Sequence, residues 1–207
     1  MLEELMEDID RYSFLEKNRS WLYVLIAKQG LWALTEYRCS HLVRTKVHTP
    51  ILRQVLKFFS FIWHKVVEVT TGIDLPSEAK IGKGLYIPHF GQIFVHPSAN
   101  IGDYCTLSQG VTIGLGGRRD KQGVPKIGDR VYIAPGAKIF GAITIGNDVA
   151  IGANAVVTKD LPDNAVAVGV PAKVVSYKGS GDFTSYRGYN SFEFVNFSTD
   201  EVTQHSQ

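Results

Sequence analysis

The sequence predicts a parallel β-helix preceded by an α-helical region, and two observations lead to that prediction. From about residue 75 to residue 157, aliphatic residues recur at every sixth position, and glycine often follows them. Ahead of this repeat, apolar residues are spaced as on amphipathic helices. A period of six fits no amphipathic helix, whose apolar positions recur at three and four residues. It does fit short strands that are joined by tight turns.

Residues 1–72 form the predicted helical region. The stretch SWLYVLIAKQGLWALTEYRCSHLV has helical spacing, and ILRQVLKFFSFIWHKVVEV follows after the break at Pro50. We expect two or three amphipathic helices to pack over one end of the coil and cover its exposed edge. The second stretch carries too many charged residues for a transmembrane helix. Peripheral membrane contact through residues 51–69 is an alternative, but aromatic residues at this spacing normally fill a core, which is the interpretation we favour.

The six-residue repeat forms three runs that are broken by short insertions. Its anchors are Leu75, Ile81, Ile87 and Ile93, then Val95, Ile101, Leu107 and Ile113, then Ile127, Ile133, Ile139, Ile145, Ile151 and Val157. A second inward position lies four residues after most anchors, and Cys105 occupies one of these positions, which indicates a core residue. Three short sides close a triangular coil, and stacked coils bury one column of aliphatic side chains. The predicted β-helix domain spans residues 73–178 and includes a loop at 114–126.

The remaining features limit the classes of function. Residues 179–207 have no period and are predicted to form a flexible tail. A net charge of +2 gives no support for nucleic-acid binding. The two cysteines form no Cys-x-x-Cys pair, so zinc binding by thiolates is unsupported. The acidic amino terminus lacks the pattern of a signal peptide, and we therefore expect a cytoplasmic protein.

The motifs SQGVTIG, IGANAVV and VGVPAKVV, together with Asp74 in GIDLP and His89 in IPHFG, resemble the serine acetyltransferase branch of the hexapeptide-repeat acyltransferases. The resemblance covers roughly residues 22–178. It implies a left-handed coil, a homotrimer with active sites between neighbouring coils, and acetyl-CoA as co-substrate along the groove. It also implies that His89 is the general base and that Asp74 holds the other nitrogen of its ring.

The residue types at these two positions suit that chemistry. A neutral imidazole with a pKa near ~6.5 is matched to the working pH, and a carboxylate fixes its tautomer. Asp74 and His89 are fifteen residues apart, a little under one coil of three hexads, so they can approach each other between layers. Alone, His89 would be interpreted as structural and Asp74 as a cap of the first coil, but together they favour a base. Direct transfer to a hydroxyl needs no serine or cysteine nucleophile.

Matching of positions extends the implied site. The resemblance implies CoA contacts at Pro135 and Ala153, on neighbouring coils, and phosphate partners at Lys159 and Lys173. The loop at 114–126 is rich in glycine and basic residues, and in relatives it reaches over the cleft. We interpret it as a lid whose cations bind the CoA phosphates or an anionic acceptor. The alternative is a solvent-exposed loop that binds no ligand.

Three positions depart from the pattern of the family. The serine enzymes have an aspartate directly before the histidine and an arginine–histidine pair before the loop proline. This chain has Pro88, Gly123 and Val124 at those positions. None of the three can pair with the ammonium or carboxylate group of serine. We therefore expect a sugar or polysaccharide-precursor hydroxyl as the acceptor, and L-serine, as in cysteine biosynthesis, is the alternative.

Two more distant classes remain open, a metal-dependent hydratase and a non-catalytic trimeric scaffold on the same fold. His96 is the second histidine of the coil, but a three-histidine zinc site would lack its third ligand there. We interpret His96 as a surface turn residue and expect no metal.

Overall fold

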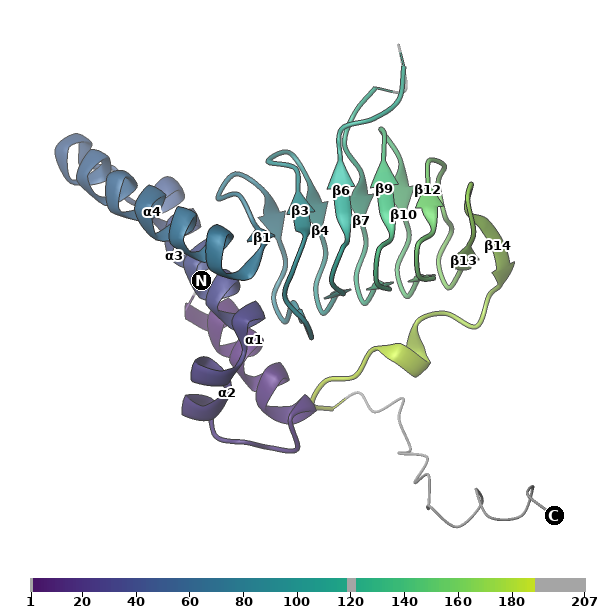
Figure 1. Cartoon of the computed structure of the whole chain (residues 1–207), viewed down its shortest axis with the longest axis horizontal. Helices are drawn as coiled ribbons and strands as arrows, with labels where there is room; N and C mark the ends of the chain where they lie inside the picture. Colours follow the sequence, from purple (N-terminus) through teal and green to yellow (C-terminus); the bar gives the residue numbers. More distant parts are fainter. Residues whose placement is uncertain (1, 119–121, 189–207) are drawn as a thin grey trace.

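The computed structural model describes residues 2–118 and 122–188 of the chain. Four helices lead into a coil of short strands, and they lie at the end of the coil opposite the last strand (Figure 1). The helices are α1 (Leu2–Leu15), α2 (Trp21–Ala27), α3 (Gln29–Lys46) and α4 (Pro50–Thr71). Pro50 starts α4, where a missing N–H costs nothing, and Gly72 ends it with a φ of +66° that glycine adopts without strain.

The strands are two to four residues long, as a six-residue repeat requires. They are β1 (Ile73–Asp74), β2 (Lys80–Ile81), β3 (Ile93–Val95), β4 (Asn100–Ile101), β5 (Thr106–Leu107), β6 (Thr112–Gly114), β7 (Lys126–Ile127), β8 (Tyr132–Ile133), β9 (Lys138–Phe140), β10 (Thr144–Ile145), β11 (Ala150–Ile151), β12 (Val156–Val157), β13 (Val166–Val168) and β14 (Lys173–Ser176). They form three sheets: sheet A is β1-β3-β6-β9-β12, sheet B is β2-β4-β7-β10, and sheet C is β5-β8-β11-β13-β14. All pairs are parallel except β13–β14.

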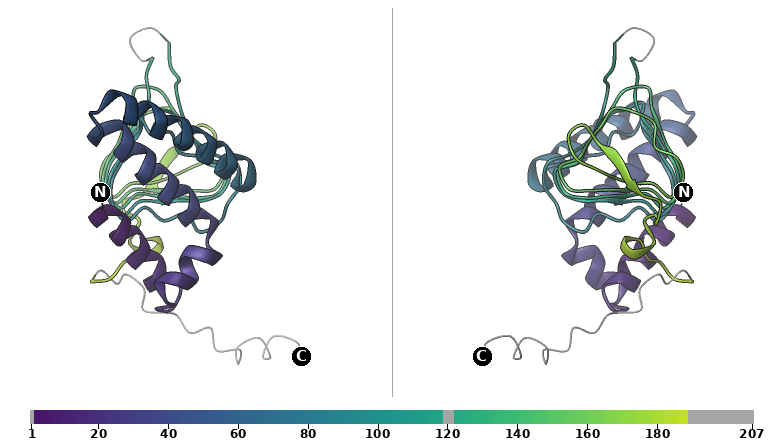
Figure 2. Two further views of the ribbon diagram at one scale, coloured as in Figure 1. Left: turned by 90° about the vertical axis from the view of Figure 1, so that its left-hand side faces the viewer. Right: turned by 90° about the vertical axis from the view of Figure 1, so that its right-hand side faces the viewer.

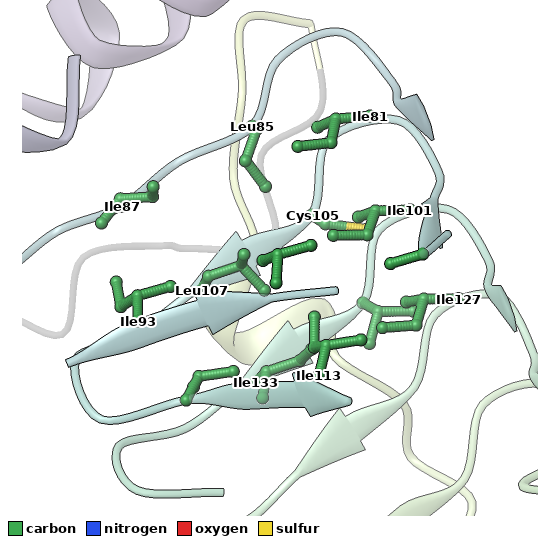
Figure 3. Close-up of a cluster of buried hydrophobic side chains, with 14 of the residues drawn as sticks. Ile81, Leu85, Ile87, Ile93, Ile101, Cys105, Leu107, Ile113, Ile127 and Ile133 are labelled. Atoms are coloured by element: carbon green, nitrogen blue, oxygen red, sulfur yellow. The ribbon is translucent and has the colours of Figure 1, made fainter. Parts of the chain in front are cut away.

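The register confirms that three hexads make one coil. Ile127 pairs with Ile145 in sheet B, and Ile133 pairs with Ile151 in sheet C. The anchors point inward and form one buried column, part of which Figure 3 shows. Cys105 belongs to this column with no exposed surface, and its burial raises the pKa of the thiol to about 12. The predicted role of Cys105 as a core residue is confirmed.

The helices lie across the end of the coil, as predicted (Figure 2). The hydroxyl of Tyr12 donates to the carbonyl of Ile87 at 3.0 Å and accepts from its N–H at 2.9 Å. The hydroxyl of Tyr37 donates to Ala79 at 2.9 Å and accepts from the Ile81 N–H at 3.1 Å. These side chains satisfy backbone groups of the first coil that have no strand on their outer side.

One helix does not pack as expected. The prediction that the apolar residues of 51–69 fill a core is wrong for the single chain, because only Val67 and Thr71 of α4 are buried. Residues 51–69 are helical, as their spacing predicts, but periodicity does not show which side of a helix meets its neighbour. Among the residues that the structure describes, no helix has the length and apolar character that a membrane span requires.

The segment after the coil also corrects a prediction. Residues 179–188 were expected to be flexible, but they run back along the coil toward α1 (Figure 1). Phe183 stacks on Tyr132 with ring centroids 4.9 Å apart, and Tyr186 stacks on Tyr104 at 3.9 Å. Isolated aromatics without a period therefore find partners on the outer face of the coil, which a composition argument does not detect. The rest of the predicted tail, 189–207, lies outside the described residues.

Candidate active site

His89 lies at the corner where the chain passes from sheet C to sheet A. Tyr86 precedes it and bridges to Thr106 of β5, and β3 follows it. We call the stack of equivalent corners, residues 88–91, 108–110, 134–136 and 152–154, the corner row. Backbone hydrogen bonds of 2.9 Å join its successive levels, from Gly110 to Gly91, from Gly136 to Gln109 and from Asn154 to Pro135.

The corner row contains three of the predicted site residues. Pro135 and Ala153 lie on successive levels below His89, in line along the coil. His89, Pro135 and Ala153 each belong to a different coil. The row therefore has the extended shape that a long, thin ligand such as CoA needs. The structure therefore brings together His89, Pro135 and Ala153 along one edge.

A cavity of about 380 Å³ opens at His89. Its lining residues are Arg11, Leu15, Tyr86, Pro88, His89, Thr106, Ser108, Gln109, Tyr132, Pro135, Phe183 and Ser185. Aromatic rings from the first coil, from the third coil and from the carboxyl-terminal segment contribute walls. The side-chain oxygen of Gln109 is buried and has no hydrogen-bond partner within the described residues, so it can accept a hydrogen bond from a ligand.

His89 itself is exposed at the mouth of this cavity, and it makes no hydrogen bond or ion pair with another described residue. Its predicted bond to Asp74 is not formed. Instead, the Asp74 carboxylate lies 3.3 Å from Nε2 of His64, whose Nδ1 lies 3.0 Å from Glu36. Asp74, and then Glu36, raise the pKa of His64 to about 10, so this imidazole is charged at neutral pH. The direct passage of α4 into β1 brings His64 to Asp74, and no motif in the sequence indicates that contact.

Arg11 forms the floor of the cavity and was missed in the sequence. Its side chain is 1% exposed and donates to the carbonyls of Cys105 and Ser185, at 2.7 and 3.1 Å. It also donates to Gly84 and to Thr106 Oγ1. Burial lowers the pKa of Arg11 to about 10. One guanidinium thus joins α1, the first two coils and the carboxyl-terminal segment, a role that nothing in the acidic amino-terminal sequence suggests.

The remaining predicted residues lie elsewhere. Lys173 of β14 pairs with Val168 at the end of β13, which is the sheet C strand of the last coil. It therefore lies beside the corner that continues the corner row. Lys159 follows β12 and therefore lies at the corner between sheets A and B, away from the corner row. Nδ1 of His96 accepts from the Ser98 N–H at 3.0 Å, as a turn residue does. In the parts of the chain that the structure describes, no group of three or more His, Cys, Asp or Glu residues could hold a metal.

The described parts of the loop at 114–126, residues 114–118 and 122–126, leave the coil at the end of β6 and project away from it (Figure 1). Gly116 and Gly123 pair through two backbone hydrogen bonds at the foot of the loop. The foot of the loop follows the strand β6, at the corner between sheets A and B. His89 precedes the strand β3, at the corner between sheets C and A. None of the described loop residues lines the cavity at His89. The basic residues of the loop are Arg118, Arg119, Lys121 and Lys126, and of these Arg119 and Lys121 lie outside the described residues.

The family model for the bacterial transferase hexapeptide (six repeats) matches residues 125–159. A serine acetyltransferase of Helicobacter pylori is 39% identical over 153 residues, which are 74% of this chain and 85% of that protein. One from Bacillus pumilus is 35% identical and covers 84% and 77% of the two chains. The chain belongs to the serine acetyltransferase family.

Solved structures agree with this assignment. Serine acetyltransferase of Brucella abortus in complex with coenzyme A superposes with a TM-score of 0.73 at 27% identity, over 86% of this chain and 68% of that one. Soybean serine acetyltransferase complexed with serine gives 0.71 at 30% identity, over 84% and 68%. The predicted left-handed parallel β-helix with an amino-terminal helical region is confirmed, and the protein is an acyltransferase of this family.

Proposed function

We propose that the protein transfers the acetyl group of acetyl-CoA to the hydroxyl group of a small molecule, with His89 as the general base. The observation that supports this most directly is the position of His89. It is an exposed imidazole without a partner in the described chain, at the mouth of a cavity and at the head of the row that contains Pro135 and Ala153. CoA is the ligand of the related Brucella abortus structure, which supports acetyl-CoA as the donor.

The reaction needs one proton carrier and a means to stabilise negative charge. His89 takes the proton of the acceptor hydroxyl while its oxygen attacks the thioester carbonyl. The C–S bond then breaks, the acetyl group stays on the acceptor oxygen, and the CoA thiolate recovers the proton from the imidazolium. Backbone N–H groups of the row are the proposed donors to the oxyanion.

Asp74 has two competing roles. The prediction that it orients His89 stays a prediction, since the carboxylate bonds to His64 in the single chain. Asp74→Asn distinguishes the two roles. If Asp74 orients the base, turnover falls, though by less than in His89→Ala, and stability changes little. If it serves only to hold α4, stability falls and turnover per folded enzyme is retained.

L-serine is the acceptor that the comparisons favour, and it replaces a sugar as our first candidate. The chain is 34–39% identical to several bacterial serine acetyltransferases over most of their length. A sugar-type hydroxyl is the second candidate for a specific reason. Pro88, Gly123 and Val124 offer no charge to an amino acid, and the cavity has aromatic walls at Tyr86 and Phe183, which suit the apolar face of a sugar ring.

A homotrimer with sites between neighbouring coils is part of the proposal. The loop at 114–126 follows a strand of sheet A, whereas His89 precedes one, so the two lie at different corners of the coil. The loop of one chain can therefore act as a lid only for the cavity of a neighbour.

Release of the CoA thiol separates the candidates. The enzyme is supplied with acetyl-CoA and either L-serine, other amino acids, or a panel of sugars and sugar nucleotides. We expect L-serine to give the highest kcat/KM. A sugar compound with a kcat/KM at least ~10²-fold higher would make the second candidate correct. Absence of thiol release with every acceptor, from a folded protein that does not bind acetyl-CoA, would contradict acetyl transfer itself.

A further inference from the structure

Two arginines are buried where the helices meet the first coil, and they differ in their countercharge. Arg38 of α3 is 2% exposed and donates to both oxygens of the Asp8 carboxylate, at 2.9 and 3.2 Å. Arg11 of α1 is 1% exposed, and its hydrogen-bond partners in the described chain are three backbone carbonyls and one hydroxyl. A buried charge is costly and is normally paired with an opposite one. Within the described residues, the charge of Arg11 lacks such a partner.

The hydrogen bonds of Arg11 also leave one of its donors unused. A guanidinium has five N–H groups. Nε donates to the Ser185 carbonyl, and Nη2 donates to Thr106 Oγ1. Nη1 donates to the carbonyls of Gly84 and Cys105. Four N–H groups are therefore occupied by described residues, and the fifth belongs to a side chain that lines the cavity at His89.

The hydroxyl of Ser185 is a second polar group without a partner at the same cavity. Ser185 is 6% exposed, and its Oγ is buried and makes no hydrogen bond within the described residues. Buried hydroxyl groups are normally hydrogen-bonded, because an unpaired one has lost its water. Ser185 lines the cavity together with Arg11, which donates to the Ser185 carbonyl at 3.1 Å. Two unused donors, one of them charged, thus belong to two residues that are in contact.

This pair of donors suits a carboxylate. One N–H and one O–H provide a hydrogen bond for each of its two oxygens, and the guanidinium compensates its single charge. A phosphate group carries up to two negative charges, and Arg11 is the only Lys, Arg, Asp or Glu among the described residues that line the cavity. The volume of about 380 Å³ accommodates a molecule of the size of an amino acid.

We propose that Arg11 and Ser185 bind the carboxylate group of the acceptor, so that the acceptor is a hydroxy acid such as L-serine and not a neutral sugar. The proposal rests on the proposed acetyl transfer, because His89 lines the same cavity and takes the proton of the acceptor hydroxyl there. It also accounts for the uncharged residues Pro88, Gly123 and Val124. The charge that they do not offer comes from α1, outside the repeat.

A pair of acceptors tests the proposal on the full chain. L-serinamide has a neutral amide where L-serine has the carboxylate. We expect kcat/KM for thiol release from acetyl-CoA to be at least ~10²-fold higher with L-serine than with L-serinamide. Arg11→Gln should lower this ratio at least ~10-fold, mainly through the KM of L-serine. Both acceptors are measured on one preparation, so that a partial loss of folded enzyme cancels in the ratio.

Two further variants complete the test. Ser185→Ala removes a single hydroxyl that bonds to no described residue, so it provides the result if Arg11→Gln does not fold. It should lower the ratio about three- to tenfold. Arg130→Gln is the matched control, because Arg130 pairs with Asp148 at 2.7 Å and does not line the cavity. It should keep the ratio of the native chain.

Binding without turnover separates this proposal from the proposed reaction. By ligand-observed NMR without acetyl-CoA, the native chain should bind L-serine at least ~10-fold more tightly than L-serinamide. A difference in binding without thiol release from either compound would support the carboxylate site and contradict acetyl transfer to serine. Equal binding of the two compounds would overturn the carboxylate site. So would a native ratio in both Arg11→Gln and Ser185→Ala, or a ratio that is lost in Arg118→Gln instead, which would place the carboxylate at the loop.

Discussion

At the scale of the residue, two histidines in the structure have opposite environments. His89 is exposed and has no partner in the described chain, whereas His64 is bonded on both ring nitrogens to carboxylates. A base must be neutral in the resting enzyme and able to accept a proton, while a doubly bonded imidazolium holds its proton. The environments therefore support the proposal that His89 is the general base, and they give His64 a structural role.

Replacement of His89 by alanine should lower turnover at least ~10²-fold and leave the affinity for acetyl-CoA nearly unchanged, because a general base acts on the transition state. Steady-state thiol release and direct CoA binding measure the two effects. His96→Ala is the matched control, since His96 is the second histidine of the coil and its ring accepts a hydrogen bond from the Ser98 N–H of its own turn. Near-normal turnover in folded His89→Ala would refute the assignment.

His64 predicts a dependence of stability on pH. Its pKa is about 10 in the folded chain and near ~6.5 when unfolded. The folded state thus holds the proton more tightly. The contribution of His64 to the free energy of unfolding is complete below about pH 6.5 and is lost as the pH rises through about 10.

Urea unfolding of the native chain and of His64→Gln at pH 6, 8 and 10 measures this contribution. We expect the native chain to exceed the variant most at pH 6 and least at pH 10. His48→Gln, at an exposed position without a carboxylate partner in the described chain, should show no such trend. A difference between native chain and His64→Gln that does not change with pH would contradict the raised pKa.

At the scale of the element, the carboxyl-terminal segment forms part of the candidate site. Phe183 and Ser185 line the cavity at His89, and Ser185 accepts a hydrogen bond from Arg11 on its floor. A segment without strand or helix periodicity is thus held by aromatic stacking and one buried guanidinium. The segment is positioned to influence which acceptor fits.

Truncation of one side chain tests that influence. Phe183→Ala should raise the KM of the acceptor about three- to tenfold, because an aromatic contact contributes about 0.5–1.5 kcal/mol. The KM of acetyl-CoA should change less, since Pro135 is the only one of the four predicted CoA contacts, Pro135, Ala153, Lys159 and Lys173, that lines this cavity. Tyr177→Ala is the control, because Tyr177 is 67% exposed and lies outside the cavity. Equal effects of the two variants would exclude Phe183 from the acceptor site.

At the scale of the whole molecule, a single chain contains only part of the proposed site. The cavity has His89 and aromatic walls, but the basic loop projects from the opposite end of sheet A. A site that combines the loop with His89 requires a second chain, which is the physical reason for expecting an oligomer.

The mass in solution tests this expectation. Light scattering at micromolar concentration should give three times the 22.9 kDa of the chain. Mixing of His89→Ala with a variant whose loop cations Arg118 and Arg119 are replaced by alanine should restore part of the activity, because some interfaces then combine two intact halves. A fully active monomer would refute the site between subunits.

The sequence by itself predicted the coil, and the resemblance of its motifs implied His89 as the general base. A six-residue period leaves no other regular fold for residues 73–178, since each anchor must turn inward and each corner must be tight. The same period placed Cys105 in the core, because position within a repeat is a local property, whereas Pro135 and Ala153 were implied by the resemblance. Pro50 and Gly72 likewise fixed the ends of α4.

Only the tertiary structure decided which side chains meet across the chain. Asp74 bonds to His64 rather than to His89, Arg11 lies beneath the cavity, and Phe183 closes its wall. Each of these contacts joins a segment outside the repeat to the coil, and no period relates such segments to it. The side of α4 that meets α3 was undetermined for the same reason, because an amphipathic pattern shows that a helix has two faces and does not show which face is covered.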